Sequence, residues 1–481
     1  MMRHLTLAAL LGAPLALTGC GDDDSDSPSD ELNLTNVEKV LQTNVQLALA
    51  AYSDSVDTVA ELSDAILQFE ANPSEANLIA AKRAWLVARE PYGQTEVFRF
   101  RLSPIDSTNY ADEDGPEGDI NAWPLGEALI DYVQVAAPDF DTDQIGVTQH
   151  STPVNGGQAI DADFAASNPA ENIIGNLDIT IDLDLLANTA TAEDEHDVIS
   201  GYHAIEFLLW GQDLNNAGAP TNGQDRETAV KVWDADQLAT GGQRPLEDFT
   251  DPVLGPRRFA YLKVAVTKLL ADLTQVKEGW DAGGAYREAF LQVDSQEDAK
   301  QRLAEILTGM GTLSEGELAG ERMQIAFSAN SQEDEHSCFS DNTHRDIWLD
   351  AEGIKNSFIG VYAGFDRDLD GIDDDATNAA WGYSLQDLLI DSGHSDLAER
   401  FQAALAQTEA GYMAIDASAR NGQPFDVLIQ DTSSTAVADT IRALNAQSAI
   451  ITEIAAVWDL GTVVDPEASA CDTTTPSAEC P

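Results

Sequence analysis

Basic residues are scarce in this chain. Its 481 residues include 25 Lys and Arg against 84 Asp and Glu, which gives a formal net charge of −59. A surface this negative repels phosphate, so the composition excludes a general nucleic-acid binder and predicts no nucleic-acid partner. Two interpretations of the charge stay open. It concentrates cations near a cleft, or it keeps the protein hydrated and soluble in salty surroundings.

Cysteines are few, and several catalytic motifs are missing. The four cysteines form no C-x-x-C pair, which leaves no cysteine-based metal or haem-attachment motif. Cys471 and Cys480 either close a small disulfide loop in an oxidising compartment or remain thiols. The chain has no glycine-rich phosphate loop and no G-x-S-x-G elbow, so nothing in it supports nucleotide-dependent or serine-hydrolase chemistry.

Long apolar runs are missing except at the N-terminus. The run Leu5–Leu17 is too short to span a bilayer and predicts a signal peptide at residues 1–19. Leu17-Thr18-Gly19-Cys20 resembles a bacterial lipobox, which implies a lipid on Cys20 and an acidic tether at residues 20–34. We therefore expect an exported protein of the bacterial envelope, periplasm-facing or in the outer membrane, that contacts the membrane through its lipid anchor only.

The hydrophobic pattern after Thr35 is helical. Apolar residues recur every three or four positions from Val37 to Leu49 and from Val56 to Phe69, which predicts two successive helices. A further helix follows the break at residues 72–74. Alternating β-branched runs are rare, and residues 178–183 fit either a loop or a short strand. With 43% hydrophobic residues, the sequence predicts an all-α fold of helical bundles with long decorated loops.

An acidic segment recurs along the chain. Glu193-Asp194-Glu195-His196 is repeated as Glu333-Asp334-Glu335-His336. Each copy is followed by a helix and a second histidine, His203 or His344, at intervals that differ by one residue. A duplicated helical unit would explain the repeat, and chance similarity within an acid-rich chain is the alternative.

The sharpest motif is Gly201-Tyr202-His203-Ala204-Ile205-Glu206. On a helix, His203 and Glu206 project from the same face. An imidazole nitrogen and a carboxylate oxygen suit zinc, iron or manganese. The alternatives are a surface ion pair or a buried histidine hydrogen-bonded to Glu206. The inverted metallopeptidase signature is incomplete, because position 207 is Phe.

Several segments in a fixed order resemble a known family. Gly-x-His-x-x-Glu at residues 201–206 is the hallmark of the imelysin family, also called the insulin-cleaving metalloproteinase-like family. Residues 84–100 are similar to that family's early helix. Residues 116–124 with residues 130–132, and residues 332–346, resemble its iron-regulated protein A branch. The resemblance runs from about Val37 to Trp458.

The resemblance implies two related helical bundles packed with pseudo-two-fold symmetry. We place the first at residues 35–250 and the second at residues 251–465, with an acidic insertion near 366–375 and a tail at 466–481. The family's metal site carries over onto His203 and Glu206. Glu96 is the further acidic candidate, with an ordinary helix carboxylate as the alternative. Additional candidates for this site are Arg89, Glu335, His336, His344 and Asp346. Arg89 is expected to hold carboxylates by bidentate hydrogen bonds.

A second cation site is predicted in the acidic insertion. Asp366, Asp368 and Asp370 alternate before Gly371, and Asp374 follows. A tight turn would bring their hard oxygen donors together, as calcium requires. A solvated acidic turn is the alternative.

We therefore expect an envelope-anchored protein that binds a divalent metal and takes part in iron uptake or iron-responsive metal handling, with an envelope transport partner. Iron rests on the resemblance, because one histidine with carboxylates cannot separate iron from zinc. The first alternative is a zinc metallopeptidase in which Glu206 or Glu96 activates a metal-bound water. The second is a non-catalytic adaptor that docks a transport or redox partner through its acidic face.

Overall fold

The structure is a computed structural model of the chain. It describes residues 31–123, 125–132, 150–154, 157–160, 172–188, 198–213, 241–242, 244–332, 334–372, 378–431 and 433–464. The predictions made for Cys20, Asp374, Cys471 and Cys480 lie outside these residues, as does the first copy of the acidic repeat.

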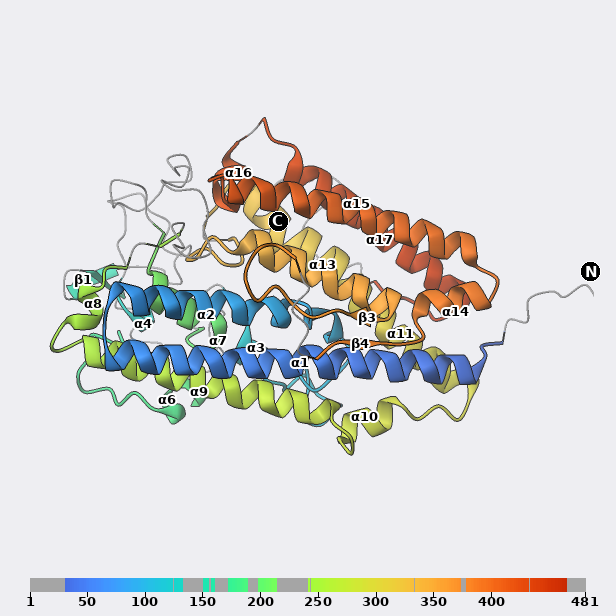
Figure 1. Cartoon of the computed structure of the whole chain (residues 1–481), viewed down its shortest axis with the longest axis horizontal. Coiled ribbons are helices and arrows are strands. Elements are labelled where there is room, and N and C mark those ends of the chain that lie inside the picture. Colours follow the sequence, from blue (N-terminus) through green and yellow to red (C-terminus); the bar gives the residue numbers. More distant parts are fainter. Residues whose placement is uncertain are drawn as a thin grey trace, which may run out of the picture.

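One long helix organises the N-terminal half. α1 (Leu34–Ala71) has α2 (Glu75–Gly93) and α9 (Gly255–Trp280) packed along it (Figure 1). The prediction of two helices within α1 was wrong. Neither Gly nor Pro interrupts residues 50–56, so the helix continues through them.

Shorter elements complete this half and carry several candidate site residues. They are η1 (Glu96–Phe98), α3 (Glu117–Ile120), α4 (Glu127–Ile130), α6 (Leu183–Asn188), α7 (Gly201–Trp210), α8 (Glu247–Thr250) and α10 (Ala285–Phe290). Both α2 and α9 pack against α7, which places the Gly-x-His-x-x-Glu motif inside the molecule.

The C-terminal half is a second group of helices. α11 (Gln296–Thr312) continues into η3 (Leu313–Gln324), a π-helix, and then into α12 (Ile325–Ala329). The remaining helices are α13 (Thr343–Ile359), α14 (Leu385–Asp391), α15 (Ser395–Arg420), α16 (Phe425–Gln430) and α17 (Ala436–Val457). α15 and α17 pack together, α17 lies on η3, and α13 contacts both α15 and α2 (Figure 1).

The boundary that the sequence predicts between the two bundles, between residues 250 and 251, falls just before α9. This helix packs on α1 and α7, so it joins the N-terminal group of helices. The two symmetry-related bundles remain a prediction. Within the described part of the chain, every helix is too short or too polar to cross a bilayer.

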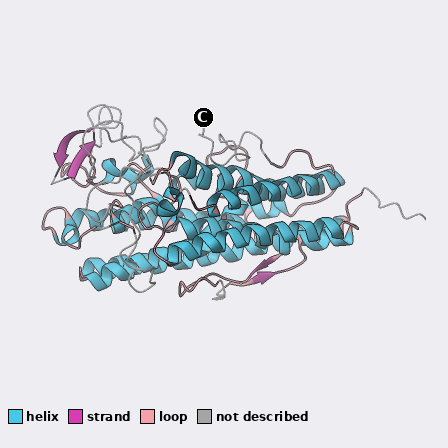
Figure 2. Cartoon of the chain, turned by 90° about the horizontal axis from the view of Figure 1, so that it is seen from above, coloured by secondary structure: helices cyan, strands magenta, loops and turns pink. Residues whose placement is uncertain are grey.

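Among the described residues, two small hairpins interrupt the otherwise helical fold (Figure 2). β1 (His150–Val154) pairs antiparallel with β2 (Gly157–Ile160), and β3 (Val361–Tyr362) pairs antiparallel with β4 (Ala380–Trp381). The second hairpin brackets the acidic insertion. Residues 178–182 are irregular, which favours the loop interpretation of that segment.

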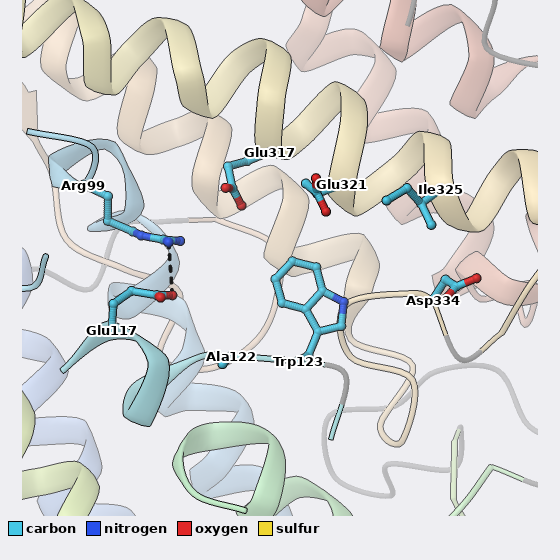
Figure 3. Close-up of a pocket in the computed structure, with 8 residues that line it drawn as sticks. All are labelled: Arg99, Glu117, Ala122, Trp123, Glu317, Glu321, Ile325 and Asp334. Carbon is cyan, nitrogen blue, oxygen red and sulfur yellow. Dashed lines mark ion pairs between the residues drawn. The ribbon is translucent and has the colours of Figure 1, made fainter. Parts of the chain in front are cut away.

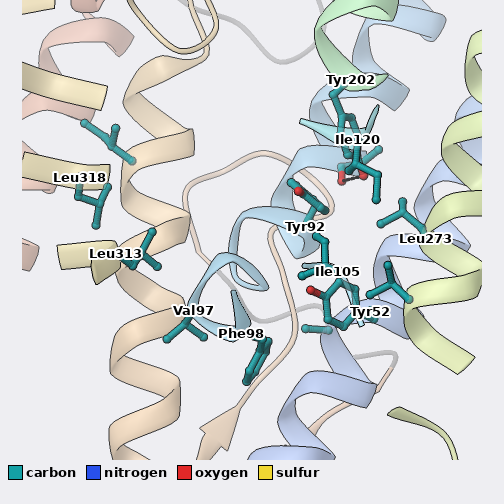
Figure 4. Packing of buried hydrophobic residues seen from close by; sticks show 14 of the residues in the cluster. Tyr52, Tyr92, Val97, Phe98, Ile105, Ile120, Tyr202, Leu273, Leu313 and Leu318 are labelled. Carbon is teal, nitrogen blue, oxygen red and sulfur yellow. Dashed lines mark hydrogen bonds between the residues drawn. The ribbon is translucent and has the colours of Figure 1, made fainter. Parts of the chain in front are cut away.

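A continuous apolar core joins the two helix groups. Side chains from α1, α2, η1, α9 and η3 meet there (Figure 4). Tyr52 packs on Phe98, and Tyr92 packs on Tyr202 with ring centroids 4.9 Å apart. Because Phe98 and Tyr202 belong to η1 and α7, this core surrounds the elements that carry Glu96 and His203.

Candidate functional site

α7 begins at a position that only glycine can occupy. Gly201 has a φ of +82°, in the left-handed region, and a Cβ there would lie 2.3 Å from the carbonyl oxygen of Ile120. All ten residues of the helix are buried. The first residue of the motif thus lets α7 approach the end of α3 closely enough to bury His203 and Glu206.

His203 and Glu206 form a buried hydrogen-bonded pair. The Nδ1 atom of His203 lies 2.8 Å from Oε2 of Glu206. The backbone N–H and the hydroxyl of Ser340 donate to Oε1 of Glu206 at 2.9 and 2.6 Å. Both oxygens of Glu206 are therefore engaged, whereas Nε2 of His203 has no hydrogen-bond partner among the described residues.

The dry surroundings remove the charge from this pair. Burial, assisted by the positive charge of Arg89, lowers the pKa of His203 to about 3. Burial also raises the pKa of Glu206 to about 8. At neutral pH the imidazole is therefore neutral and the metal-free carboxyl group holds a proton. Because Oε1 of Glu206 accepts from Ser340, this proton lies on Oε2 and is donated to Nδ1 of His203, so Nε2 carries the ring hydrogen until a metal displaces it.

The C-terminal half brings His336 against His203. Their ring centroids are 4.8 Å apart and their planes are almost perpendicular. Nη1 of Arg322 lies 2.7 Å from Nε2 of His336, and Nδ1 of His336 lies 3.2 Å from Oδ2 of Asp346. Since arginine only donates, Nε2 accepts and Nδ1 donates. Burial lowers the pKa of His336 well below its usual value, which agrees with a neutral ring.

Asp346 is the charged centre of the network. Nε of Arg89 donates to Asp346 Oδ1 at 3.0 Å, while Nη1 of Arg89 donates to Asn121 at 2.6 Å. The hydroxyl of Ser337 donates to Oδ2 of Asp346. Burial alone would raise the pKa of Asp346, but Arg89 and His336 hold it well below the usual range. Arg89 thus contacts this carboxylate through a single nitrogen.

Glu96 is joined to the network through Arg322. Nη2 of Arg322 and Nη1 of Arg99 both donate to Oε2 of Glu96 at 2.8 Å. Burial raises the pKa of Glu96, but the two arginines outweigh this effect and hold it at about 2. The carboxylate is therefore ionised. Its other oxygen, Oε1, has no hydrogen-bond partner among the described residues.

A pocket of about 280 Å³ opens beside the network (Figure 3). Glu317 and Glu321 lie on η3 on one side of it, and Arg99 pairs with Glu117 on another. The indole of Trp123 lines the pocket, and its ring centroid is 4.4 Å from that of His336. Trp123 therefore separates the acidic pocket from the buried histidines.

The structure groups the predicted site residues into two sets. His203, Glu206, His336, Asp346 and Arg89 lie in one network, to which Arg322 joins Glu96. Glu335 instead lies beside two other carboxylates. His344 donates from Nδ1 to the carbonyl oxygen of Asp341 at 2.9 Å, and its Nε2 lies 3.5 Å from Asp416.

Sequence reasoning missed Arg322, Trp123 and Ser340 as members of the network. Ser340 and Trp123 fall in segments that resemble the family, so that signal was present. Arg322 lies on η3, and π-helices are frequent at functional sites but leave no simple sequence pattern.

The acidic insertion does bring its aspartates together. Oxygens of Asp366, Asp368 and Asp370 lie within 4.8 Å of one another. Asp366 is buried and accepts hydrogen bonds from the backbone N–H groups of Asp370 and Gly371. These bonds form the turn from within the loop itself. Calcium binding there stays a prediction.

These features define a largely helical protein with a buried histidine and carboxylate network where its two helix groups meet. The sequence profile described as Imelysin (Peptidase_M75) matches residues 48–451, and the chain belongs to the imelysin family.

Three known proteins are similar to the chain. A stretch of 80 residues is 34% identical to "Iron-regulated protein A" of Synechococcus elongatus, and the match spans 17% of this chain and about a fifth (20%) of that relative. A solved structure from Parabacteroides distasonis, described as an iron-regulated protein A precursor, matches with a TM-score of 0.57 at 17% identity, over 89% of this chain and 96% of the other. An imelysin-like protein from Psychrobacter arcticum matches with a TM-score of 0.47 at 14% identity, over 89% and 94%. The first of these structures supports the helical fold.

Proposed function

We propose that the chain binds a divalent metal ion through His203 and Glu96, and that it handles iron at the bacterial envelope. The observation that carries this proposal is the state of His203. Its imidazole is buried and neutral, and its Nε2 atom lacks a hydrogen-bond partner among the described residues. A buried ring nitrogen without a partner is costly, and a metal ion that displaces its hydrogen would satisfy it.

Glu96 is the matching oxygen donor. Arg322 bonds to both Glu96 and His336, and His336 packs on His203, so Glu96 and His203 belong to one buried network. The arginines occupy only Oε2 of Glu96, and Oε1 stays open. One imidazole nitrogen and one carboxylate oxygen suit zinc, iron or manganese. Among the described residues, no third His, Cys, Asp or Glu completes a compact triad with these two, so solvent would supply the remaining ligands.

Glu206 is better placed as a positioning residue than as a ligand. It bonds to Nδ1 of His203 and is itself held by Ser340. A carboxylate behind a metal-bound imidazole fixes which nitrogen carries the proton and how the ring points. In this role Glu206 would pass its proton to Nδ1 of His203 when a metal displaces the hydrogen of Nε2, and as a carboxylate it would then accept from Nδ1 and leave Nε2 to the metal.

The surrounding charge favours a cation. Arginines and carboxylates alternate through the network, and the carboxylates are in formal excess. The arginines are Arg89, Arg99 and Arg322, and the carboxylates are Glu96, Glu117, Glu317, Asp346 and Asp350. Glu321 and Asp334 add to the same sign at the pocket. This field would raise the local concentration of cations next to Trp123.

Iron as the cargo and the envelope as the location are the finer parts of the proposal. Iron is supported by the names of the Synechococcus elongatus and Parabacteroides distasonis relatives. Attachment to the envelope is supported by the lipobox-like sequence Leu17-Thr18-Gly19-Cys20.

The test is a metal titration of protein first stripped with a chelator. Wild type, His203→Ala and Glu96→Gln are titrated with Zn²⁺ and, without oxygen, with Fe²⁺, and bound metal is counted after desalting. We expect each variant to lose the same single ion. His394→Ala is the matched control, because His394 lies outside the network at the start of α15.

Circular dichroism of each variant verifies that it folds. If His203→Ala were to unfold, Glu96→Gln alone decides, since it keeps the shape of the side chain and removes only its charge. Wild-type stoichiometry and affinity in both folded variants would overturn the assignment.

A further inference from the structure

Three buried carboxylates lie together outside the His203 and Glu96 site. Glu335 precedes His336 in the segment before α13, Asp341 lies later in that segment, and Asp426 is on α16. Their side chains are almost fully buried, and one oxygen from each lies within 4.8 Å of the others. Oxygen ligands on opposite sides of a calcium ion are about 5 Å apart, so this spacing fits a single cation.

Two of these carboxylates lack a cationic partner among the described residues and have oxygens without a geometric hydrogen bond. Neither oxygen of Glu335, nor Oδ1 of Asp341, has a hydrogen-bond partner among the described residues. Neither residue forms an ion pair with a lysine or arginine in that part of the chain. A buried carboxylate without a partner is among the most costly groups a fold can contain.

Other buried carboxylates of this protein show the contrast. Four of them are each paired with an arginine at a distance of 3.0 Å or less. These pairs are Glu90 with Arg345, Glu96 with Arg322, Asp131 with Arg258, and Asp346 with Arg89. These four carboxylates are thus neutralised by cationic side chains, and no described lysine or arginine pairs with Glu335 or Asp341.

We propose that Glu335, Asp341 and Asp426 form a second cation site, which takes a hard divalent cation such as Ca²⁺ or Mn²⁺ through oxygen donors. Three carboxylates without an imidazole or thiolate select hard ions. The site is distinct from the proposed His203 site, which contains a nitrogen donor. A cation here would link α16 to the segment before α13.

That segment also serves the His203 network. Ser340, whose backbone and hydroxyl hold Glu206, is the residue directly before Asp341. Asp341 has a φ of +58°, and its carbonyl oxygen accepts a hydrogen bond from His344. The cation would therefore fix the backbone that places Ser340 on Glu206.

The metal-free site gives a second readout. Burial and the neighbouring carboxylates raise the pKa values of Glu335 and Asp341 well above their usual range. Replacing them by carboxamides removes this electrostatic cost and keeps the side-chain shape. We therefore expect Glu335→Gln with Asp341→Asn to fold, with a metal-free melting temperature equal to or above that of wild type.

The experiment compares chelator-treated wild type with this double variant in Ca²⁺ and in Mn²⁺, by bound-ion counting and by thermal melting. Wild type is expected to bind one ion more than the double variant and to show a cation-dependent rise in melting temperature that the variant lacks or shows only in part. Glu399→Gln, an exposed glutamate on α15, is the matched control. The single variant Asp341→Asn repeats the test if the double variant does not fold.

Equal ion counts and equal melting shifts in wild type and double variant would overturn this second site. The result is separate from that of the His203 site, because loss of Zn²⁺ binding in His203→Ala does not involve these carboxylates. It is also separate from the acidic insertion, since Asp368→Asn with Asp370→Asn leaves Glu335 and Asp341 unchanged.

Discussion

A buried lysine beside α7 tests how dry the interior around the site is. Lys82 lies on α2 and is almost fully buried, with its Nζ atom 5.0 Å from the centroid of the Trp210 ring. It forms no ion pair with any described residue. Burial, with a contribution from the charge of Arg244, lowers the pKa of Lys82 to about 8. The same burial keeps His203 neutral, so Lys82 reports on this environment without touching the site.

Lys82→Met is predicted to stabilise the protein at pH 7. The pKa of Lys82 falls from 10.5 in the unfolded chain to about 8 in the folded one, which corresponds to a cost of roughly 3 kcal/mol for the charged form at pH 7. Methionine removes this cost and keeps an apolar stem against Trp210. Loss of the cation–π contact between Lys82 and Trp210 lowers the stability by about 1 kcal/mol. The expected net gain is about 2 kcal/mol.

The stability difference between Lys82→Met and wild type should depend on pH. Between pH 8 and 10.5 the unfolded chain binds more protons at Lys82 than the folded one, so the stability of wild type rises with pH in this window. The advantage of Lys82→Met should therefore fade as pH rises from 8 to 10.5. Urea denaturation at pH 7 and pH 10.5 measures it, with the exposed Lys39→Met as control. A variant less stable than wild type at pH 7, or a difference independent of pH, would refute the reasoning.

Three further predictions concern the motif and the acidic insertion. Gly201→Ala should destabilise the fold by more than the roughly 1–2 kcal/mol that an alanine costs in a left-handed conformation, because its Cβ would also meet a backbone oxygen. Gly118→Ala is the control, since there is open space around its Cβ, and urea denaturation should show a far smaller loss of stability. In metal-free protein, the free energy of unfolding of wild type should fall by up to roughly 4–5 kcal/mol as pH rises from 4.5 to 8, because the pKa of Glu206 is raised in the folded state. Glu206→Gln should lack this pH dependence, and an equal pH dependence in both proteins would contradict the prediction. If the insertion binds calcium, Asp368→Asn with Asp370→Asn should bind one Ca²⁺ fewer than wild type on equilibrium dialysis, whereas an unchanged count leaves a solvated turn.

Local sequence patterns were enough to predict the helical fold and one side of the site. The break at residues 72–74 separates α1 from α2, and Ser74 caps α2 by accepting from the N–H of Asn77. The spacing of His203 and Glu206 predicted side chains on one helical face, and the two are in contact. These features depend on residues a few positions apart, which is the range that helical periodicity covers.

Contacts between distant segments could not be derived in this way. The acidic repeat matches His203 with His344, but the histidine packed on His203 is His336. Arg322 reaches Glu96 and His336 from a π-helix, whose altered hydrogen bonding turns side chains off the α-helical face. Glu335 resembled a ligand for the same site, and only the tertiary fold places it with Asp341 and Asp426 instead.

The most direct test of the account is an anomalous diffraction map from crystals of chelator-treated protein soaked in Zn²⁺. The account predicts a peak about 2.0–2.1 Å from Nε2 of His203, with Glu96 as a neighbouring ligand. A well-ordered His203 with no peak beside Nε2, in a crystal that binds zinc elsewhere, would contradict it.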